Sequence, residues 1–222
     1  MQQKNNISNS VIRRLPRYYR FLGELLKQGI TKISSRELSE KMRLTASQIR
    51  QDLNCFGGFG QQGYGYNVAE LRQEIAHILG LDTMRKIILI GAGNLGRAIT
   101  VHIDFRKYGY ELVGIFDNNI SMEGIEISGI PIMHTNSLKE FCEEYNPRMA
   151  VLCIPRDSAK ETVTKLMSYG VNAFWNFSHY DIHFDFPEAD VENVHLTDSL
   201  MTLSYSAKNH VNNHPDYDDS AE

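Results

Sequence analysis

The sequence is short of the features that mark membrane and secreted proteins. No run of 18 or more apolar residues, the minimum for a transmembrane helix, occurs in the 222-residue chain. The first 20 residues carry arginines and tyrosines, where a secretory signal needs an apolar stretch. We therefore expect a cytoplasmic protein without a membrane partner.

Cysteine is also scarce. Cys55, Cys142 and Cys153 lie far apart in the chain, form no CxxC pair and have no histidine at the spacing of a zinc site. Neither a disulfide framework nor a metal site is supported by this pattern. We expect all three thiols to be reduced and structural, and no metal to be bound.

The net charge of −4 conceals two parts of opposite sign. Residues 1–80 contain 12 lysines and arginines against 6 acidic residues, whereas the remaining residues contain 11 against 21. Such a division indicates a basic module that meets a polyanion, joined to an acidic module with another task. The chain length also allows two modest cores, at about 100 to 200 residues per domain.

The basic part has the pattern of a helix-turn-helix. Apolar residues spaced three and four apart predict a helix within 8–28, which Pro16 either kinks or starts. Two short helices, over 35–42 and 46–54, follow almost without a gap and form a helix-turn-helix. Each is opened by a capping box, and the two boxes are Ser34 with Glu37 and Thr45 with Gln48.

A glycine-rich stretch with aromatic residues, 57–66, comes next and suits a β-hairpin. A helix-turn-helix followed by a hairpin is the plan of a winged helix. Asn67 with Glu70 makes a third capping box, which opens a helix to about Leu79. This helix is expected to link the winged helix to the next domain.

Beyond Lys86 the pattern changes to alternating strands and helices. Residues 87–90 form a continuous apolar run, as expected for a strand buried on both faces. The further predicted strands are 111–116, 149–154 and 173–177, and the predicted helices lie near 94–107, 136–145 and 157–169. This alternation predicts an α/β domain of Rossmann type with a doubly wound parallel sheet.

A last helix, from Leu196 to about Lys208, has no strand to return to and is expected to dock elsewhere. The polar, acidic end of the chain is expected to be disordered. The predicted parts are a winged-helix domain (1–82), a Rossmann-type domain (83–195), a C-terminal helix (196–210) and a tail (211–222).

A glycine motif follows the first predicted strand of the Rossmann-type domain and opens its first helix. Its residues are Gly91, Ala92, Gly93, Asn94, Leu95 and Gly96. The first glycine permits a tight turn, the second lets a pyrophosphate approach the backbone, and the third lets the helix pack on the sheet. The helix N-terminus offers N–H groups and a positive dipole end to the phosphates. We therefore predict a dinucleotide site here.

Asp117 ends the next predicted strand, 21 residues beyond Gly96. A carboxylate at this place accepts hydrogen bonds from the adenosine ribose and repels a 2′-phosphate. The sequence thus predicts NADH or NAD as the cofactor. Coenzyme A binders share the glycine-rich turn and remain an alternative, which Asp117 disfavours because a 3′-phosphate would crowd the carboxylate.

The winged helix carries the predicted DNA contacts. Ser47, Arg50 and Gln51 lie on the second helix of the helix-turn-helix, which can enter a major groove. Arginines of the first helix add positive charge for phosphates, and the hairpin can reach a minor groove. The arginines are Arg13, Arg14, Arg17 and Arg20, and the hairpin residues are Gln61, Gln62 and Tyr64.

An enzyme is the runner-up interpretation. A dehydrogenase needs a catalytic acid or base against the nicotinamide, but the histidines form no recognisable constellation, and too few residues follow Lys86 for a substrate domain. We therefore expect no catalytic residue. A protein-binding module with a vestigial nucleotide fold is a further alternative.

From about Val11 to Tyr205 the sequence resembles the Rex family of bacterial redox-sensing repressors. The motifs that carry the resemblance are RRLPRYYR (13–20), SSRELSEKM (34–42), TASQIRQDLNCFGGFGQQGYGY (45–66), GAGNLGRA (91–98), IPR (154–156), WNF (175–177) and VENVHL (191–196). The resemblance implies a homodimer whose last helix is swapped between subunits. It also implies that NADH releases a palindromic operator, that NAD permits binding, and that the target genes concern fermentation, respiration and NADH reoxidation.

The resemblance extends to single positions. Arg50 and Gln51 match the recognition-helix contacts, and Pro155 matches a loop along the nucleotide. Leu196 stands where an aromatic residue reaches the partner's nicotinamide pocket. A relay of tyrosine, aspartate and arginine between cofactor and winged helix matches His102, His195 and Arg20. Because imidazole gains a proton near neutral pH and the charged ring repels arginine, His195 is predicted to make the switch pH-sensitive.

Overall fold

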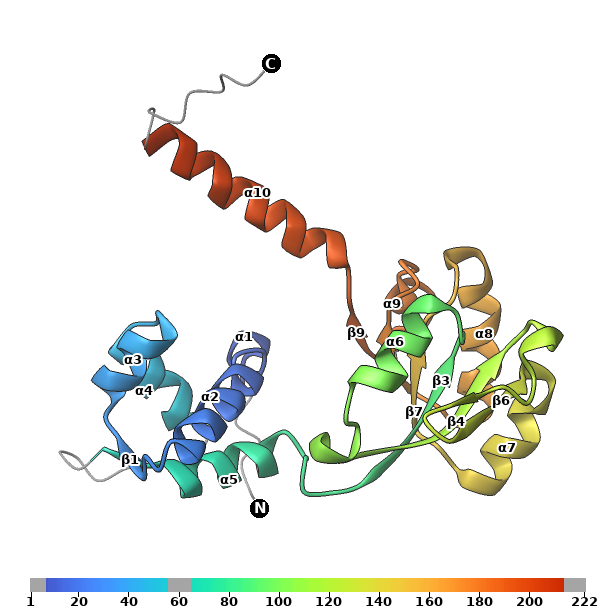
Figure 1. The fold of residues 1–222 in the computed structure, drawn as a ribbon, viewed down its shortest axis with the longest axis horizontal. Helices are drawn as coiled ribbons and strands as arrows, with labels where there is room; N and C mark the ends of the chain where they lie inside the picture. The colour runs from blue at the N-terminus through green and yellow to red at the C-terminus, as the bar shows by residue number, and fades with distance from the viewer. Residues whose placement is uncertain (1–6, 56–64, 214–222) are drawn as a thin grey trace. The chain divides into compact units, whose positions relative to one another are not determined.

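The structure, a computed structural model of the chain, describes residues 7–55 and 65–213 (Figure 1). The chain divides into two compact units, Met1–Thr83 and Met84–Glu222. In the described parts, no helix combines the length and the apolar character that crossing a membrane requires.

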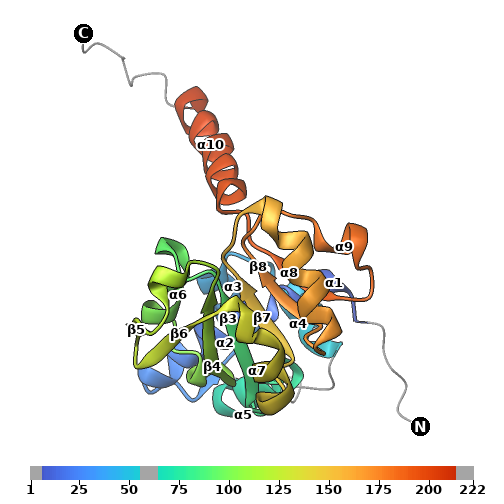
Figure 2. The same cartoon turned by 90° about the vertical axis from the view of Figure 1, so that its right-hand side faces the viewer.

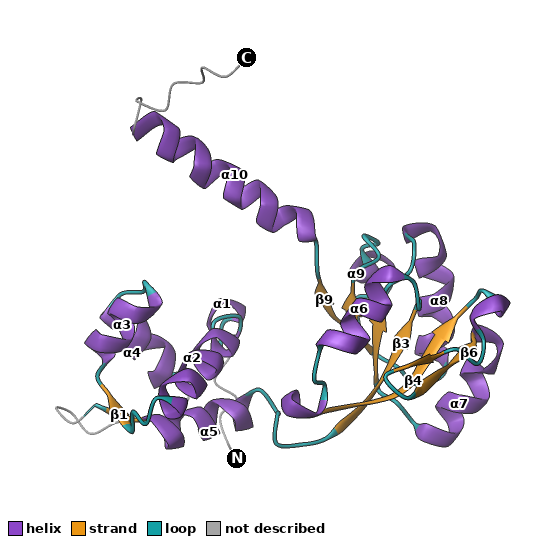
Figure 3. Cartoon of the chain, viewed as in Figure 1, coloured by secondary structure: helices purple, strands orange, loops and turns teal. Residues whose placement is uncertain are grey.

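The first unit is mainly helical (Figure 3). Its elements are α1 (Asn9–Ile12), α2 (Leu15–Lys27), β1 (Lys32–Ile33), α3 (Ser35–Met42), α4 (Ala46–Asn54), β2 (Tyr66–Asn67) and α5 (Val68–Ile78). The short strands pair antiparallel, with Ile33 opposite Tyr66. Leucines and isoleucines of α2 to α5 form one core, in which Leu22, Leu38, Ile49 and Ile75 are fully buried.

The helix predicted within 8–28 is two helices. The chain turns at Arg13 and Arg14, and Pro16 lies in the first turn of α2. At that position proline fits, because its missing N–H would have no partner within the helix. The predicted hairpin over 57–66 lies outside the described residues except for Gly65 and Tyr66.

One predicted capping box forms completely. Ser34 Oγ accepts from the Glu37 N–H at 3.1 Å, and the Glu37 carboxylate accepts from the Ser34 N–H at 2.8 Å. Thr45 accepts from the Gln48 N–H at 3.1 Å, but the Gln48 side chain donates to Asp52 instead of closing the box. Leaving a buried carboxylate without a donor costs more than leaving an exposed N–H without a protein acceptor. The predicted Thr45 cap is therefore present, but the reciprocal bond from Gln48 is not.

The third predicted capping box is also incomplete. Asn67 Oδ1 accepts from the N–H groups of Ala69 and Glu70, at 3.0 and 3.3 Å. The Glu70 carboxylate accepts from the Asn67 side-chain amide at 2.9 Å, not from its backbone. The cap itself is present, and α5 begins where the sequence places it.

The second unit is a sheet with helices on both faces. Its strands are β3 (Arg85–Ile90), β4 (Tyr110–Asp117), β5 (Glu126–Ile127), β6 (Ile130–His134), β7 (Met149–Leu152), β8 (Ala173–Asn176) and β9 (Asp190–Asn193). They lie in the order β5-β6-β4-β3-β7-β8-β9, and all neighbours are parallel except β5 and β6. The doubly wound parallel sheet is therefore present, with β5, β6 and β9 added to the prediction.

The helices of this unit are α6 (Asn94–His102), α7 (Leu138–Tyr145), α8 (Arg156–Ser168), α9 (Ile182–Asp185) and α10 (Leu196–Asn213). The helix predicted over 94–107 ends at His102, because Ile103 takes extended backbone. Side chains of α7, α8 and α9 pack on one face of the sheet, and α6 packs on the other.

The last helix, α10, lies outside this core (Figure 2). Every side chain from Leu196 to Lys208 is exposed. The helix continues to Asn213, three residues beyond the limit of 210 expected from the sequence.

Candidate nucleotide site and DNA-recognition surface

The glycine motif lies at the centre of the sheet's carboxyl edge. Strand β3 has β4 on one side and β7 on the other, which makes its carboxyl end a topological switch point. Backbone bonds hold the three strand ends together. Gly91 N–H donates to Phe116 O, and Cys153 N–H donates to Ile90 O, both at 2.8 Å.

Two of the three glycines are required by close packing. Gly91 has a φ of +96°, and a Cβ there would lie 2.4 Å from Cys153 O. A Cβ on Gly96 would lie 2.0 Å from Gly91 O. Gly93 differs, because a Cβ on it would meet no atom within 4 Å. The middle glycine therefore faces open space, which is where a pyrophosphate would approach the backbone.

The N-terminus of α6 is free of side-chain caps. Its N-cap residue is Gly93, and no acidic residue lies in the first turn. Asn94 and Leu95 are exposed, whereas Ala92 is buried. The first N–H groups of the helix are thus available to an anionic ligand such as a phosphate.

Asp117 is fixed by the backbone around it. Its carboxylate accepts from the Ala92 N–H at 2.7 Å and from the Asn119 N–H at 2.8 Å. These bonds tie the end of β4 to the glycine turn and aim the carboxylate along the same sheet edge. The structure thereby brings Asp117 to the glycine motif, and its bond to a ribose stays a prediction.

The other predicted cofactor residues follow neighbouring strands. Pro155 is exposed and directly precedes α8, just after β7. Leu196 is 63% exposed and begins α10.

Burial raises the pKa of the Cys153 thiol, just after β7, to about 12, and the pKa of the Cys142 thiol to about 11. Neither thiol is therefore a nucleophile near neutral pH.

A second polar cluster follows β8. Asn176 is fully buried, and its amide donates to Tyr180 O and to Asn193 Oδ1, both at 2.8 Å. Its Oδ1 accepts from the Ser178 N–H at 3.0 Å and from the Ser178 hydroxyl at 2.6 Å. These bonds hold the loop after β8 to the end of β9.

That loop places two histidines in contact. The Nδ1 atoms of His179 and His195 are 3.0 Å apart, and the rings stack with centroids 5.1 Å apart. One ring must donate and the other accept, so the bond requires at least one neutral imidazole. His102 is exposed at the end of α6. The sequence marked His195 but not its contact with His179.

The predicted recognition residues share one exposed side of α4. Ser47, Arg50 and Gln51 are all exposed. The Arg50 guanidinium donates to Ser35 Oγ at 3.1 Å and to Ser47 Oγ at 3.2 Å. Arg50 therefore lies at the first turns of both α3 and α4, within reach of a phosphate or a base edge.

The arginines of the α1–α2 segment differ in exposure and in the hydrogen bonds that their side chains make. Arg13 and Arg20 are exposed. Arg17 is also exposed, but its Nη2 donates to Met42 O at the end of α3. Arg14 is half-buried and bonded to Asp52. Gln61, Gln62 and Tyr64 lie outside the described residues, so their predicted DNA contact is not addressed by the structure.

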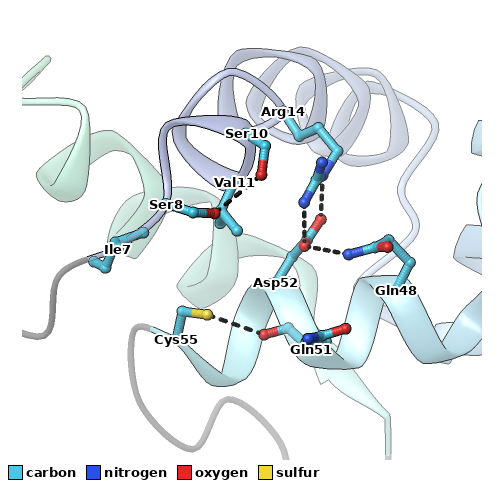
Figure 4. Close-up of a pocket in the computed structure, with 9 residues that line it drawn as sticks. All are labelled: Ile7, Ser8, Ser10, Val11, Arg14, Gln48, Gln51, Asp52 and Cys55. Atoms are coloured by element: carbon cyan, nitrogen blue, oxygen red, sulfur yellow. Dashed lines mark hydrogen bonds and ion pairs between the residues drawn. The ribbon is translucent and has the colours of Figure 1, made fainter.

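A residue that no sequence motif indicates is Asp52, a fully buried carboxylate in the first unit. It lies at a cleft of about 520 Å³ between α1 and α4 (Figure 4). Burial acts to raise its pKa, but hydrogen bonds from Arg14, Gln48 and Tyr18 outweigh burial and hold the pKa below its ordinary value. Burial and the bond to Asp52 raise the pKa of Tyr18 well above its ordinary value.

Together, the two units define a class of protein. A basic helix-turn-helix unit with an exposed second helix is joined to a parallel sheet with an open glycine turn. This combination is that of a DNA-binding regulator with a nucleotide-sensing domain.

Comparison with known proteins agrees. Residues 6–54 match a family model described as the putative DNA-binding protein N-terminus, and residues 82–180 match one described as a CoA binding domain. The redox-sensing transcriptional repressor Rex of Thermoanaerobacter pseudethanolicus is 52% identical over 92% of this chain and 91% of its own. That of Clostridioides difficile is 50% identical over 94% and 99%.

The chain belongs to the Rex family of redox-sensing transcriptional repressors. The family is one of repressors and not of enzymes. A crystal structure of RSP with NADH is similar at a TM-score of 0.85, with 47% identity over 92% of this chain and 96% of that one. A structure of RSP with NAD+ and operator DNA also has a TM-score of 0.85, with 48% identity over 97% and 99%.

The glycine turn gives a sharp test of the cofactor site. Gly93→Ala should leave the fold intact, because the added methyl meets no protein atom within 4 Å. The methyl would occupy the space of the pyrophosphate, so NADH affinity should fall about tenfold or more. Titration of NADH fluorescence checks affinity, and circular dichroism checks the fold. Unchanged affinity in a folded variant would mean that the cofactor binds elsewhere.

Proposed function

We propose that this protein is a redox-sensing repressor that binds palindromic operator DNA through α4 and senses NADH and NAD through the glycine turn after β3. The observation that carries the proposal is the open space at Gly93 beside an uncapped α6, in a chain whose other unit exposes Arg50 and Gln51. Structures of RSP, whose sequence is 47–48% identical to this chain, contain NADH in one case and NAD+ with operator DNA in the other.

The resemblance to the Rex family implies how NADH and NAD change operator binding. NADH releases the operator and NAD permits binding, so genes of fermentation, respiration and NADH reoxidation are repressed when NADH is scarce. By linkage, if NADH weakens DNA binding, DNA weakens NADH binding by the same factor. A coenzyme A ligand, which the name of the matching domain model suggests, is disfavoured by Asp117 at the end of β4.

The proposal is tested by fluorescence anisotropy on the operator duplex that the related repressor binds. We expect the protein to bind this duplex at fixed salt, NADH to release it, and NAD to leave it bound. Coenzyme A serves as the matched control ligand, since it shares the adenosine and pyrophosphate, and should have no effect. Operator binding that ignores both NADH and NAD would contradict the redox function while leaving a repressor.

The dimer predicted from the sequence has support in the last helix. Leu196, Leu200 and Leu203 are each more than 60% exposed along one side of α10. Most of the stability of a helix in a protein comes from tertiary packing of its apolar face. On the sheet, Trp175 and Phe177 are half-buried on the same face as α6. A second copy's α10 on that face would cover both surfaces, which is the swapped homodimer.

Leu200→Glu should break this dimer, because it puts a charge into the apolar contact. Sedimentation equilibrium should show a shift toward monomer of about tenfold or more in dissociation constant. Thr202→Glu, on another side of α10, is the matched control and should remain dimeric. A Leu200→Glu variant that stays as dimeric as the control would refute the role of this helix.

The relay through Arg20, His102 and His195 stays a prediction, as do the domain limits and the cytoplasmic location. If His195 makes the switch pH-sensitive, operator affinity with NADH present should change between about pH 6 and pH 8. His195→Gln should flatten the profile, whereas the exposed His183→Gln should not. An equally steep profile in the His195 variant would assign the titration to another group.

A further inference from the structure

The recognition helix α4 has one side buried in the core of its unit and one side exposed. Ile49 and Leu53 are buried in the core, and Ser47, Arg50 and Gln51 are exposed. Apolar contacts hold a helix against its neighbours, but they are not directional. Hydrogen bonds from neighbouring elements would fix the rotation of α4 about its own axis more narrowly than these contacts do.

That rotation matters for reading DNA. Side chains extend about 6 Å from a helix axis, so a rotation of about 20° would displace a recognition group by roughly 2 Å. Hydrogen bonds to base edges are made within a window of roughly 0.5 Å. A small error in the rotation of α4 would therefore cost base-specific bonds while leaving long arginine side chains able to reach phosphates.

Four hydrogen bonds are accepted by a single carboxylate of α4, that of Asp52. The Asp52 carboxylate accepts from Arg14 Nε and Nη2, both at 2.7 Å, and from the Tyr18 hydroxyl at 2.9 Å. Gln48, one turn earlier on α4, donates its amide at 2.8 Å. Figure 4 shows Arg14 and Gln48 meeting the two sides of Asp52. Tyr18 and Asp52 are fully buried.

We propose that Asp52 is a positioning residue for operator recognition, which fixes the rotation of α4 through its bonds to Arg14 and Tyr18. Replacing a buried ion pair by apolar residues is often neutral or stabilising, so stability alone does not explain a carboxylate among these leucines. Arg14 then acts through Asp52, because its Nε and Nη2 groups are both bonded to the carboxylate. The inference rests on the proposed operator binding.

Tyr18→Phe tests this with little change of shape, since it removes one bond to Asp52. We expect the ratio of operator affinity to scrambled-duplex affinity to fall about threefold, and about tenfold or more for Asp52→Asn. Affinity for the scrambled duplex and for NADH should not change. The matched control is Ile75→Val on α5, which destabilises the same core and should keep the ratio of the unchanged protein.

The measurement is anisotropy on the operator duplex of the related repressor and on a scrambled duplex of equal composition, at several salt concentrations. Arg14→Gln should lower the ratio without changing the salt slope. A slope reduced by about 0.9 with an unchanged ratio would make Arg14 a phosphate contact and overturn the proposal. So would an equal loss for both duplexes in Tyr18→Phe. If the unchanged protein does not prefer the operator, the proposed function itself fails.

Discussion

The backbone at Gly91 and Gly96 comes closer to its surroundings than any side chain permits. The Gly91 carbonyl oxygen lies 2.0 Å from where a Cβ of Gly96 would be, and Cys153 O lies 2.4 Å from where a Cβ of Gly91 would be. This close approach joins β3, β7 and α6 at one point. The uncapped N-terminus of α6, the orientation of Asp117 and the open space at Gly93 all depend on it, and so does the proposed cofactor site.

In the first unit the corresponding constraint is a buried, hydrogen-bonded carboxylate in the core. Asp52 is fully buried and accepts four hydrogen bonds, and its partners come from the turn before α2, from α2 and from α4 itself. The apolar contacts that surround this network are not directional. A satisfied polar network supplies the missing directionality, because it tolerates fewer arrangements than an apolar contact does.

Much of this organisation could be predicted from the sequence. The capping residues Ser34, Thr45 and Asn67 each begin a helix where expected, because N-cap bonds are local. The glycine motif was assigned from its position after a buried strand. The prediction failed where a buried group of the core competed with a local helix cap. Gln48 turned to Asp52 rather than to its own cap, and short strands such as β9 had too few residues to show a period.

The sequence by itself determined most of the helices, the central strands of the sheet, the position of the glycine turn, and which side of α4 faces outward, since these follow from spacing along the chain. Only the tertiary structure decided that Arg14 meets Asp52 and that His179 meets His195. The paired residues are far apart in sequence, and no local pattern records which buried or stacked partner a polar group will find once the chain has folded.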